Sequence, residues 1–110
     1  MPRPMTNDEM TEAFMEHLQA TVAYWLREER APTAREKLNG LVHSILCVFD
    51  GCAATMPAFS IVPEPHQHDR EYHAARGENW WPEPVDMNGN PTVDHPDRLA
   101  LLWTRKYEVK

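Results

Sequence analysis

The chain has 110 residues, which corresponds to a single domain with one modest core. Residues 1–5 are expected to be flexible. Apolar residues make up 42% of it and charged residues 25%, the composition of a globular protein rather than of a disordered one. Seventeen acidic and eleven basic side chains give a formal net charge of −6, and no cluster of basic residues offsets it. The charge therefore argues against a nucleic-acid partner.

Two consecutive capping boxes predict two helices joined by a tight link. The segments Thr6–Glu9 and Thr33–Glu36 each place a threonine three residues before a glutamate. Apolar residues then follow at spacings of three and four, which predicts that the two helices pack as an antiparallel pair. Pro32 ends the first helix near Arg30, and Asp50-Gly51 ends the second. The predicted buried stripes are Met10, Phe14, Leu18, Val22, Trp25 and Leu26 in the first helix, and Leu38, Leu41, Val42, Ile45, Leu46 and Phe49 in the second.

The segment after these helices predicts a small amount of β-structure. Residues Ala58–Val62 are bulky or branched and lie between two prolines, which is typical of a short strand. A lone strand needs a partner, and the other β-like segment is the tail Tyr107–Val109, so a small two-stranded sheet is the expected pairing.

The remainder of the chain predicts two short helices separated by a loop. Arg70–Arg76 can form a helix that stops at Gly77, and the proline-containing residues 79–93 predict an irregular loop. A last helix should start with Asp94 as its N-cap and Pro96 in its first turn, and the side chains expected to be buried in it are Leu99, Leu102 and Trp103. The predicted fold class is therefore α+β: a helical hairpin, a short strand or small sheet, an irregular loop and a C-terminal helix.

The histidine-rich segment Pro63–Pro84 carries a candidate metal site. In a helix that begins near His66, the side chains of His66, Asp69 and His73 stand at i, i+3 and i+7 and project from one face, where they could hold zinc or another divalent ion. Glu78 would be a fourth ligand or a general base. The alternative is that Asp69 caps a short surface helix while His73 packs against the neighbouring tryptophans. The paired HExxH spacing is missing, so the sequence leaves both interpretations open.

Glu78-Asn79-Trp80-Trp81 is the candidate partner-binding segment. Adjacent tryptophans in an extended loop point in different directions, so one could seal the core while the other is exposed as an aromatic anchor. The alternative is that both tryptophans cover the helix pair. Glu78 and Asn79 would then orient the loop.

The cysteines and the apolar runs indicate the cellular compartment in which the protein is expected. Cys47 and Cys52 are five residues apart, a spacing that matches neither a zinc motif nor a redox motif, and we expect free thiols there. No run approaches the roughly eighteen apolar residues that span a bilayer, and the first residues do not form an apolar signal core. The expected location is cytoplasmic.

Several stretches resemble a known group of proteins. These are Tyr24–Arg27, Pro32–Leu38, Gly40, Asp50-Gly51 and the residues Pro65-His66, Asp69, Tyr72-His73 and Gly77–Trp80. Over about Tyr24–Pro82 the chain is similar to small uncharacterised proteins encoded by bacteria, phages and prophages. The resemblance implies a phage or mobile-element context and assigns no activity.

The sequence predicts a small accessory or interaction protein that binds a partner protein through the aromatic loop and its acidic surroundings. An enzyme is less expected, because no catalytic motif is complete. The alternative function is a metal-binding module or metal-dependent hydrolase that uses the histidine cluster. A third option is a homodimer seam on the first helix, formed by Met10, Phe14, Met15 and Leu18.

Overall fold

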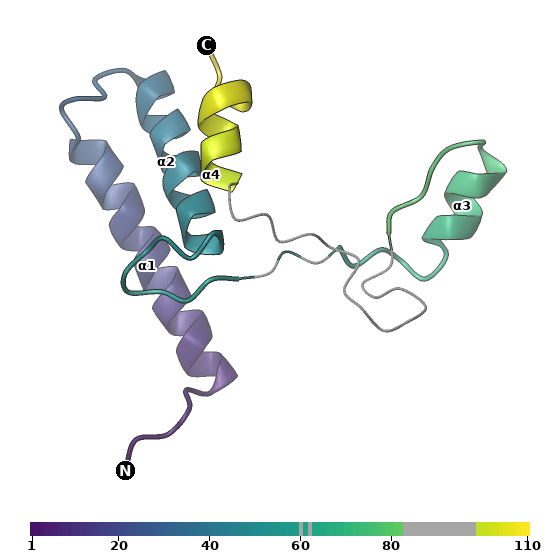
Figure 1. Cartoon of the computed structure of the whole chain (residues 1–110), viewed down its shortest axis with the longest axis horizontal. Coiled ribbons are helices and arrows are strands. Elements are labelled where there is room, and N and C mark those ends of the chain that lie inside the picture. The colour runs from purple at the N-terminus through teal and green to yellow at the C-terminus, as the bar shows by residue number, and fades with distance from the viewer. Residues whose placement is uncertain (60, 62, 83–98) are drawn as a thin grey trace. The chain divides into compact units, whose positions relative to one another are not determined.

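The computed structural model describes residues 1–59, 61, 63–82 and 99–110. Within these residues the elements are α1 (Asn7–Arg27), α2 (Ala34–Phe49), α3 (Asp69–Ala75), α4 (Leu99–Leu102) and a π-helical turn, η1 (Trp103–Tyr107), that continues α4 (Figure 1). The chain divides into two compact units, which we call the helical unit (residues 1–58 and 97–110) and the α3 unit (residues 59–96). No helix in the described ranges is both long and apolar enough to cross a bilayer.

The capping box at the start of α1 is confirmed. The Thr6 hydroxyl accepts a hydrogen bond from the Glu9 amide at 3.1 Å, and the Glu9 carboxylate accepts one from the Thr6 amide at 2.9 Å. Arg3, which lies in the segment expected to be flexible, donates to both carboxylate oxygens of Glu9, at 2.7 and 3.1 Å. The Arg3 guanidinium and the Thr6 amide lower the pKa of Glu9 to about 2. The carboxylate thus fixes the helix start and holds the preceding segment against it.

Helices α1 and α2 pack as the predicted antiparallel pair, and a glycine sets their closest approach (Figure 1). The Trp25 indole lies over Gly40 and donates from Nε1 to the Ser44 hydroxyl at 2.8 Å. Lys37 Nζ donates to the carbonyls of Trp25 and Glu28, at 3.1 and 2.7 Å. A cation is thereby placed at the C-terminal end of α1, where the helix dipole favours positive charge.

The C-terminus of α2 has the geometry of a Schellman motif, in agreement with the predicted stop. Gly51 adopts a φ of 83°, a conformation that suits glycine. The Gly51 amide donates to the Val48 carbonyl at 3.0 Å, and the Cys52 amide donates to the Cys47 carbonyl at 2.9 Å. The preceding residue, Asp50, reaches across to the next helix in space.

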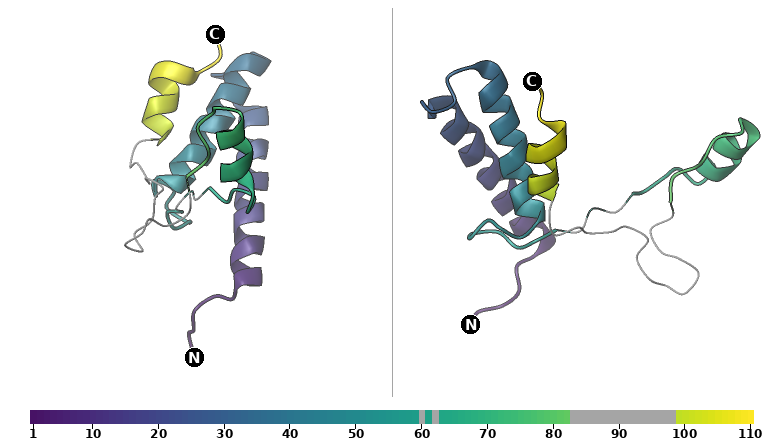
Figure 2. Two further views of the ribbon diagram at one scale, coloured as in Figure 1. Left: turned by 90° about the vertical axis from the view of Figure 1, so that its right-hand side faces the viewer. Right: turned by 45° about the horizontal axis from the view of Figure 1, so that its top comes forward.

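Helix α4 lies along α2 on the side away from α1 (Figure 2). Its first described amides, of Leu99 and Ala100, donate to the two carboxylate oxygens of Asp50, at 3.0 and 2.9 Å. The end of α2, 49 residues before Leu99 in the chain, therefore supplies the acceptors for these two amides. The predicted cap residues, Asp94 and Pro96, lie outside the described residues.

The expected strand at the C-terminus is wrong, and a side chain takes the place of a partner strand. Tyr107 belongs to the π-helical turn, not to a strand. The Asn39 amide group donates to the Val109 carbonyl at 2.7 Å and accepts from the Val109 amide at 2.9 Å. The backbone groups that a neighbouring strand would satisfy are thus paired with one asparagine. Trp103 Nε1 donates to the Asn39 carbonyl at 3.0 Å and packs η1 against α2.

The strand predicted at residues 58–62 is also wrong, so the α+β fold class is replaced by an all-helical one over the described residues. Ala58, Phe59 and Ile61 have no regular secondary structure, and residues 60 and 62 lie outside the described set. The physical reason is that a strand is stable only when a neighbouring strand accepts its hydrogen bonds, and the tail that could have done so is already paired with Asn39.

The helical unit buries less of its apolar stripes than their periodicity predicts. Among the described residues, only three apolar ones are buried: Ala31, Val48 and Ala100. Leu26 and Leu38, both assigned to the stripes, are 70% and 62% exposed, and Val22 and Leu102 are also exposed. Two helices that pack side by side touch along one line, and the strip that this contact covers is narrower than a 100° apolar face.

Candidate functional site

The site begins with a short helix whose two ends are fixed by the backbone. Helix α3 starts at Asp69, with His68 as its N-cap residue, and the predicted stop at Gly77 is confirmed by a φ of 72°. The Gly77 amide donates to the Ala74 carbonyl at 3.1 Å and the Glu78 amide to the His73 carbonyl at 2.9 Å. This is a second Schellman motif, and it directs the chain after Gly77 back along the helix.

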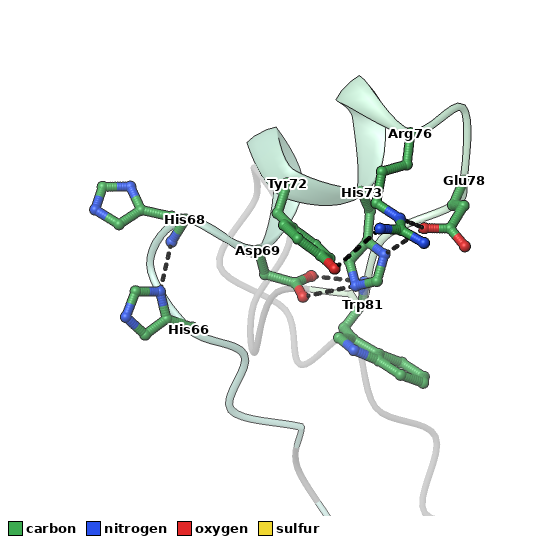
Figure 3. Close-up of polar contacts among 8 residues, drawn as sticks. All are labelled: His66, His68, Asp69, Tyr72, His73, Arg76, Glu78 and Trp81. Atoms are coloured by element: carbon green, nitrogen blue, oxygen red, sulfur yellow. Dashed lines mark hydrogen bonds and ion pairs between the residues drawn. The ribbon is translucent and has the colours of Figure 1, made fainter.

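Asp69 anchors the tryptophan loop to α3. Its Oδ2 atom accepts a hydrogen bond from the Trp81 amide at 3.0 Å, and its Oδ1 atom lies 3.1 Å from His73 Nε2 (Figure 3). The Asp69 side chain is only 12% exposed and that of His73 22% exposed. The alternative interpretation of the sequence, in which Asp69 caps its own helix, is therefore wrong. Its carboxylate fixes a backbone position twelve residues later.

His73 lies between two carboxylates. Its Nε2 atom faces Asp69, and its Nδ1 atom lies 3.4 Å from Glu78 Oε1. Glu78 also accepts a hydrogen bond from Arg76 Nε at 2.9 Å. A neutral imidazole has one N–H and can donate to one of these carboxylates, whereas an imidazolium can donate to both. The ring packs edge-on against the Trp81 ring with centroids 6.3 Å apart, so the predicted contact between His73 and a tryptophan is confirmed.

The three predicted metal ligands are not brought together. The helix starts at Asp69 instead of near His66, so His66 lies before the first turn and is not on the face that carries Asp69 and His73. Its Nδ1 atom accepts from the His68 amide at 3.1 Å, and Figure 3 shows both imidazoles apart from the Asp69–His73 pair. Among the described residues no three His, Cys, Asp or Glu side chains are grouped to hold an ion. The metal site stays a prediction that a zinc titration would test.

Exposed aromatic side chains cover the outside of this segment, and two arginines are stacked on them. Trp80 and Trp81 are 44% and 63% exposed, and Tyr72 is 58% exposed. The Arg70 guanidinium lies 4.9 Å from the centre of the Trp80 ring, and that of Arg76 lies 5.3 Å from the Tyr72 ring. We call these five residues the aromatic surface.

The sequence identified part of this surface and missed the rest. The two tryptophans were predicted from their unusual adjacency, and Glu78 and Asn79 lie beside them, both exposed. Tyr72 and Arg76 were missed, although their spacing of four residues in a predicted helix places them on one face and could have indicated the contact. The Arg76 guanidinium also donates to the Tyr72 hydroxyl at 3.3 Å. The pairing of Arg70 with Trp80 depends on the turn at Gly77 and has no local signal.

Comparison with models of protein families, with curated proteins and with solved structures finds no match to this chain.

Proposed function

We propose that this chain is a protein-binding accessory protein and that the aromatic surface of the α3 unit is its contact surface. One observation carries the proposal: the Trp81 side chain is 63% exposed, although Asp69 and His73 hold the residue in place. A flexible loop would lose conformational entropy on binding. A loop that is already hydrogen-bonded to its helix loses less, so an exposed ring on it is suited to act as an anchor.

The composition of the aromatic surface supports a protein partner. Tryptophan, tyrosine and arginine are the residue types that contribute most of the free energy at protein interfaces. All five members of the surface belong to these types. The cation–π contacts keep the two guanidinium groups over the rings, where they extend the flat area that a partner can cover.

The charge around the surface favours a protein over a nucleic acid. Aromatic rings with arginines also bind single-stranded nucleic acids, but those sites are positively charged overall. Residues 63–82 contain four carboxylates and two arginines, which gives a formal charge of −2 without the histidines. We therefore expect the partner to present basic side chains around an apolar pocket. The resemblance to phage and prophage proteins is the reason to search for it in phage-infected or prophage-carrying cells.

Capture with the tagged full chain, followed by measurement of Kd with the purified partner, tests the proposal. Trp81→Ala and Trp80→Ala should each weaken binding by tenfold or more, on the order of the 2 kcal/mol that defines an interface hot spot. Leu26→Ala is the matched control, since Leu26 is 70% exposed on α1 and lies in the other unit. It should leave Kd unchanged.

A second variant separates anchoring from contact. Asp69→Ala removes the acceptor of the Trp81 amide but leaves both indoles present, so it should weaken binding less than Trp81→Ala does. Far-ultraviolet circular dichroism and thermal melting must show that each variant is folded. The proposal is wrong if folded Trp80→Ala and Trp81→Ala variants bind every captured partner as the wild type does.

A further inference from the structure

The two cysteines are held close together by the end of α2. In the Schellman motif Cys47 supplies the carbonyl and Cys52 the amide of the outer hydrogen bond, which is 2.9 Å long. Standard bond lengths place the Cys47 Cα about 2.4 Å from its carbonyl oxygen and the Cys52 Cα about 1.5 Å from its amide nitrogen. Together with the hydrogen bond, these lengths allow the two Cα atoms to be at most about 6.8 Å apart. Disulfides join residues whose Cα atoms are about 4.4–6.8 Å apart.

The same motif in the α3 unit shows that side chains at these two positions meet. His73 and Glu78 occupy the positions around Gly77 that Cys47 and Cys52 occupy around Gly51. The His73 Nδ1 and Glu78 Oε1 atoms are 3.4 Å apart. Contact between these two positions is a regular feature of the motif. The cysteine side chains are therefore directed to the same side of the helix end.

A histidine is positioned to accept the proton of Cys47. Thr104 donates its hydroxyl proton to the Ala100 carbonyl at 3.2 Å, so its oxygen can only accept from His43 Nδ1, 3.0 Å away. This assigns the proton of His43 to Nδ1 and leaves Nε2 as an acceptor. The Cys47 sulfur lies 3.5 Å from that Nε2 atom. A thiol, a base and a group that orients the base form the arrangement that activates a nucleophile.

The two thiols differ in accessibility. Cys52 is exposed, and Cys47 is partly buried beside a hollow of about 340 Å³ that is also lined by His17, Tyr24 and Ser44. Burial raises the pKa of the Cys47 thiol, and the nearby Cys52 and Asp50 raise it further. Cys47 therefore needs a base to react at neutral pH, whereas Cys52 is open to small thiol reagents in solution.

We propose that Cys47 and Cys52 form a reversible disulfide, with a small-molecule disulfide such as oxidised glutathione as the oxidant and His43 as the base. The Cys52 thiolate attacks the oxidant, which forms a mixed disulfide and releases one glutathione. Cys47 then transfers its proton to His43 Nε2 and attacks the Cys52 sulfur, and the second glutathione leaves and takes up a proton. Two protein thiols are oxidised to one disulfide, and the oxidised glutathione is reduced to two thiols.

Equilibration of the full chain with mixtures of reduced and oxidised glutathione, followed by acid quenching and intact-mass analysis, tests the proposal. The wild type should lose the mass of two hydrogens and retain no glutathione, and a peptide map should link Cys47 to Cys52. The Cys47→Ser variant should retain one glutathione on Cys52, because it cannot complete the second step. A wild-type protein that retains glutathione as that variant does, or stays reduced where the variant is modified, would overturn the proposal.

The role of His43 has its own readout. His43→Gln should slow closure of the mixed disulfide at neutral pH by about a hundredfold, the lower end of the range that a general base contributes. At a pH high enough to ionise the Cys47 thiol in spite of its raised pKa, the reaction needs no base and the two rates should converge. An equal slowing at both pH values would show that His43 serves only the structure. Neither experiment involves the aromatic surface, so their outcome is independent of the proposed partner binding.

Discussion

Replacement of Gly40 by alanine tests the packing of α1 on α2. A Cβ atom at this position would lie 2.6 Å from Trp25 Cζ2 and closer still to the Cζ3 and Cη2 atoms of the same ring, which is far inside van der Waals contact. The indole cannot simply swing away, because its Nε1 atom is hydrogen-bonded to the Ser44 hydroxyl at 2.8 Å. Either the ring leaves that hydrogen bond or the two helices move apart.

The expected net effect is a loss of about 1–3 kcal/mol in the free energy of unfolding. Overpacking costs about 1–3 kcal/mol, and loss of a hydrogen bond costs about 0.5–1.5 kcal/mol more. Alanine gains about 1 kcal/mol over glycine in helix propensity, which offsets part of this cost. For a domain of this size the loss corresponds to a decrease in Tm of roughly 5 to 20 °C.

Urea denaturation followed by circular dichroism measures the effect, and two controls isolate it. Gln19→Ala on the exposed face of α1 changes helix propensity without a clash and should leave the stability within about 0.5 kcal/mol of the wild type. Trp25→Phe makes room for the methyl group, so Gly40→Ala should cost less in that background. If Gly40→Ala is as stable as the wild type or more so, helix propensity determines the effect of this substitution on the free energy of unfolding, and the close approach of the helices does not.

Three further changes test single contacts. Asp50→Ala should destabilise the protein by about 1–2 kcal/mol and speed amide exchange in α4, because it removes the acceptors for the first described amides of that helix. Asn39→Ala should release Val109, which faster proteolysis of the C-terminal residues would reveal. The pKa of Glu9 is lowered from 4.5 to about 2, so its contribution to stability is complete above about pH 4.5 and is lost as the pH falls through 2. Arg3→Ala should raise that pKa in an NMR titration.

The helix boundaries could be predicted from the sequence because each depends on a few neighbouring residues. A threonine three residues before a glutamate satisfies the first amides of a helix, and a glycine after the last turn allows the positive φ that ends it. These rules place the start of α1 and the ends of α2 and α3. They do not reveal the contact between Asp50 and the Leu99 amide, because these two residues are 49 positions apart in the sequence.

The two strands were predicted wrongly because residue type alone does not provide a hydrogen-bonding partner. Branched and aromatic residues favour extended backbone, but extended backbone must still pair its amides and carbonyls. The side chain of Asn39 pairs with both backbone groups of Val109, and a helical asparagine carries no signal for this contact in the local sequence. The exposure of Leu26 and Leu38 has a related cause, since periodicity identifies an apolar face but not how much of it a neighbour covers.

The proposed cysteine pair and the pair His73–Glu78 beside the aromatic surface share a pattern that can be read from the sequence once the motif is known. In Cys47–Cys52 and in His73–Glu78 a reactive or charged residue stands four positions before a helix-ending glycine, and a second one follows that glycine directly. In a helix interior, side chains five residues apart point in different directions, so helical spacing predicts no contact between the members of such a pair. The positive φ of the glycine reverses the chain and brings the pair together, as the contact between His73 and Glu78 shows. A helix-ending glycine is therefore as informative about the side chains it brings into contact as about the helix it ends.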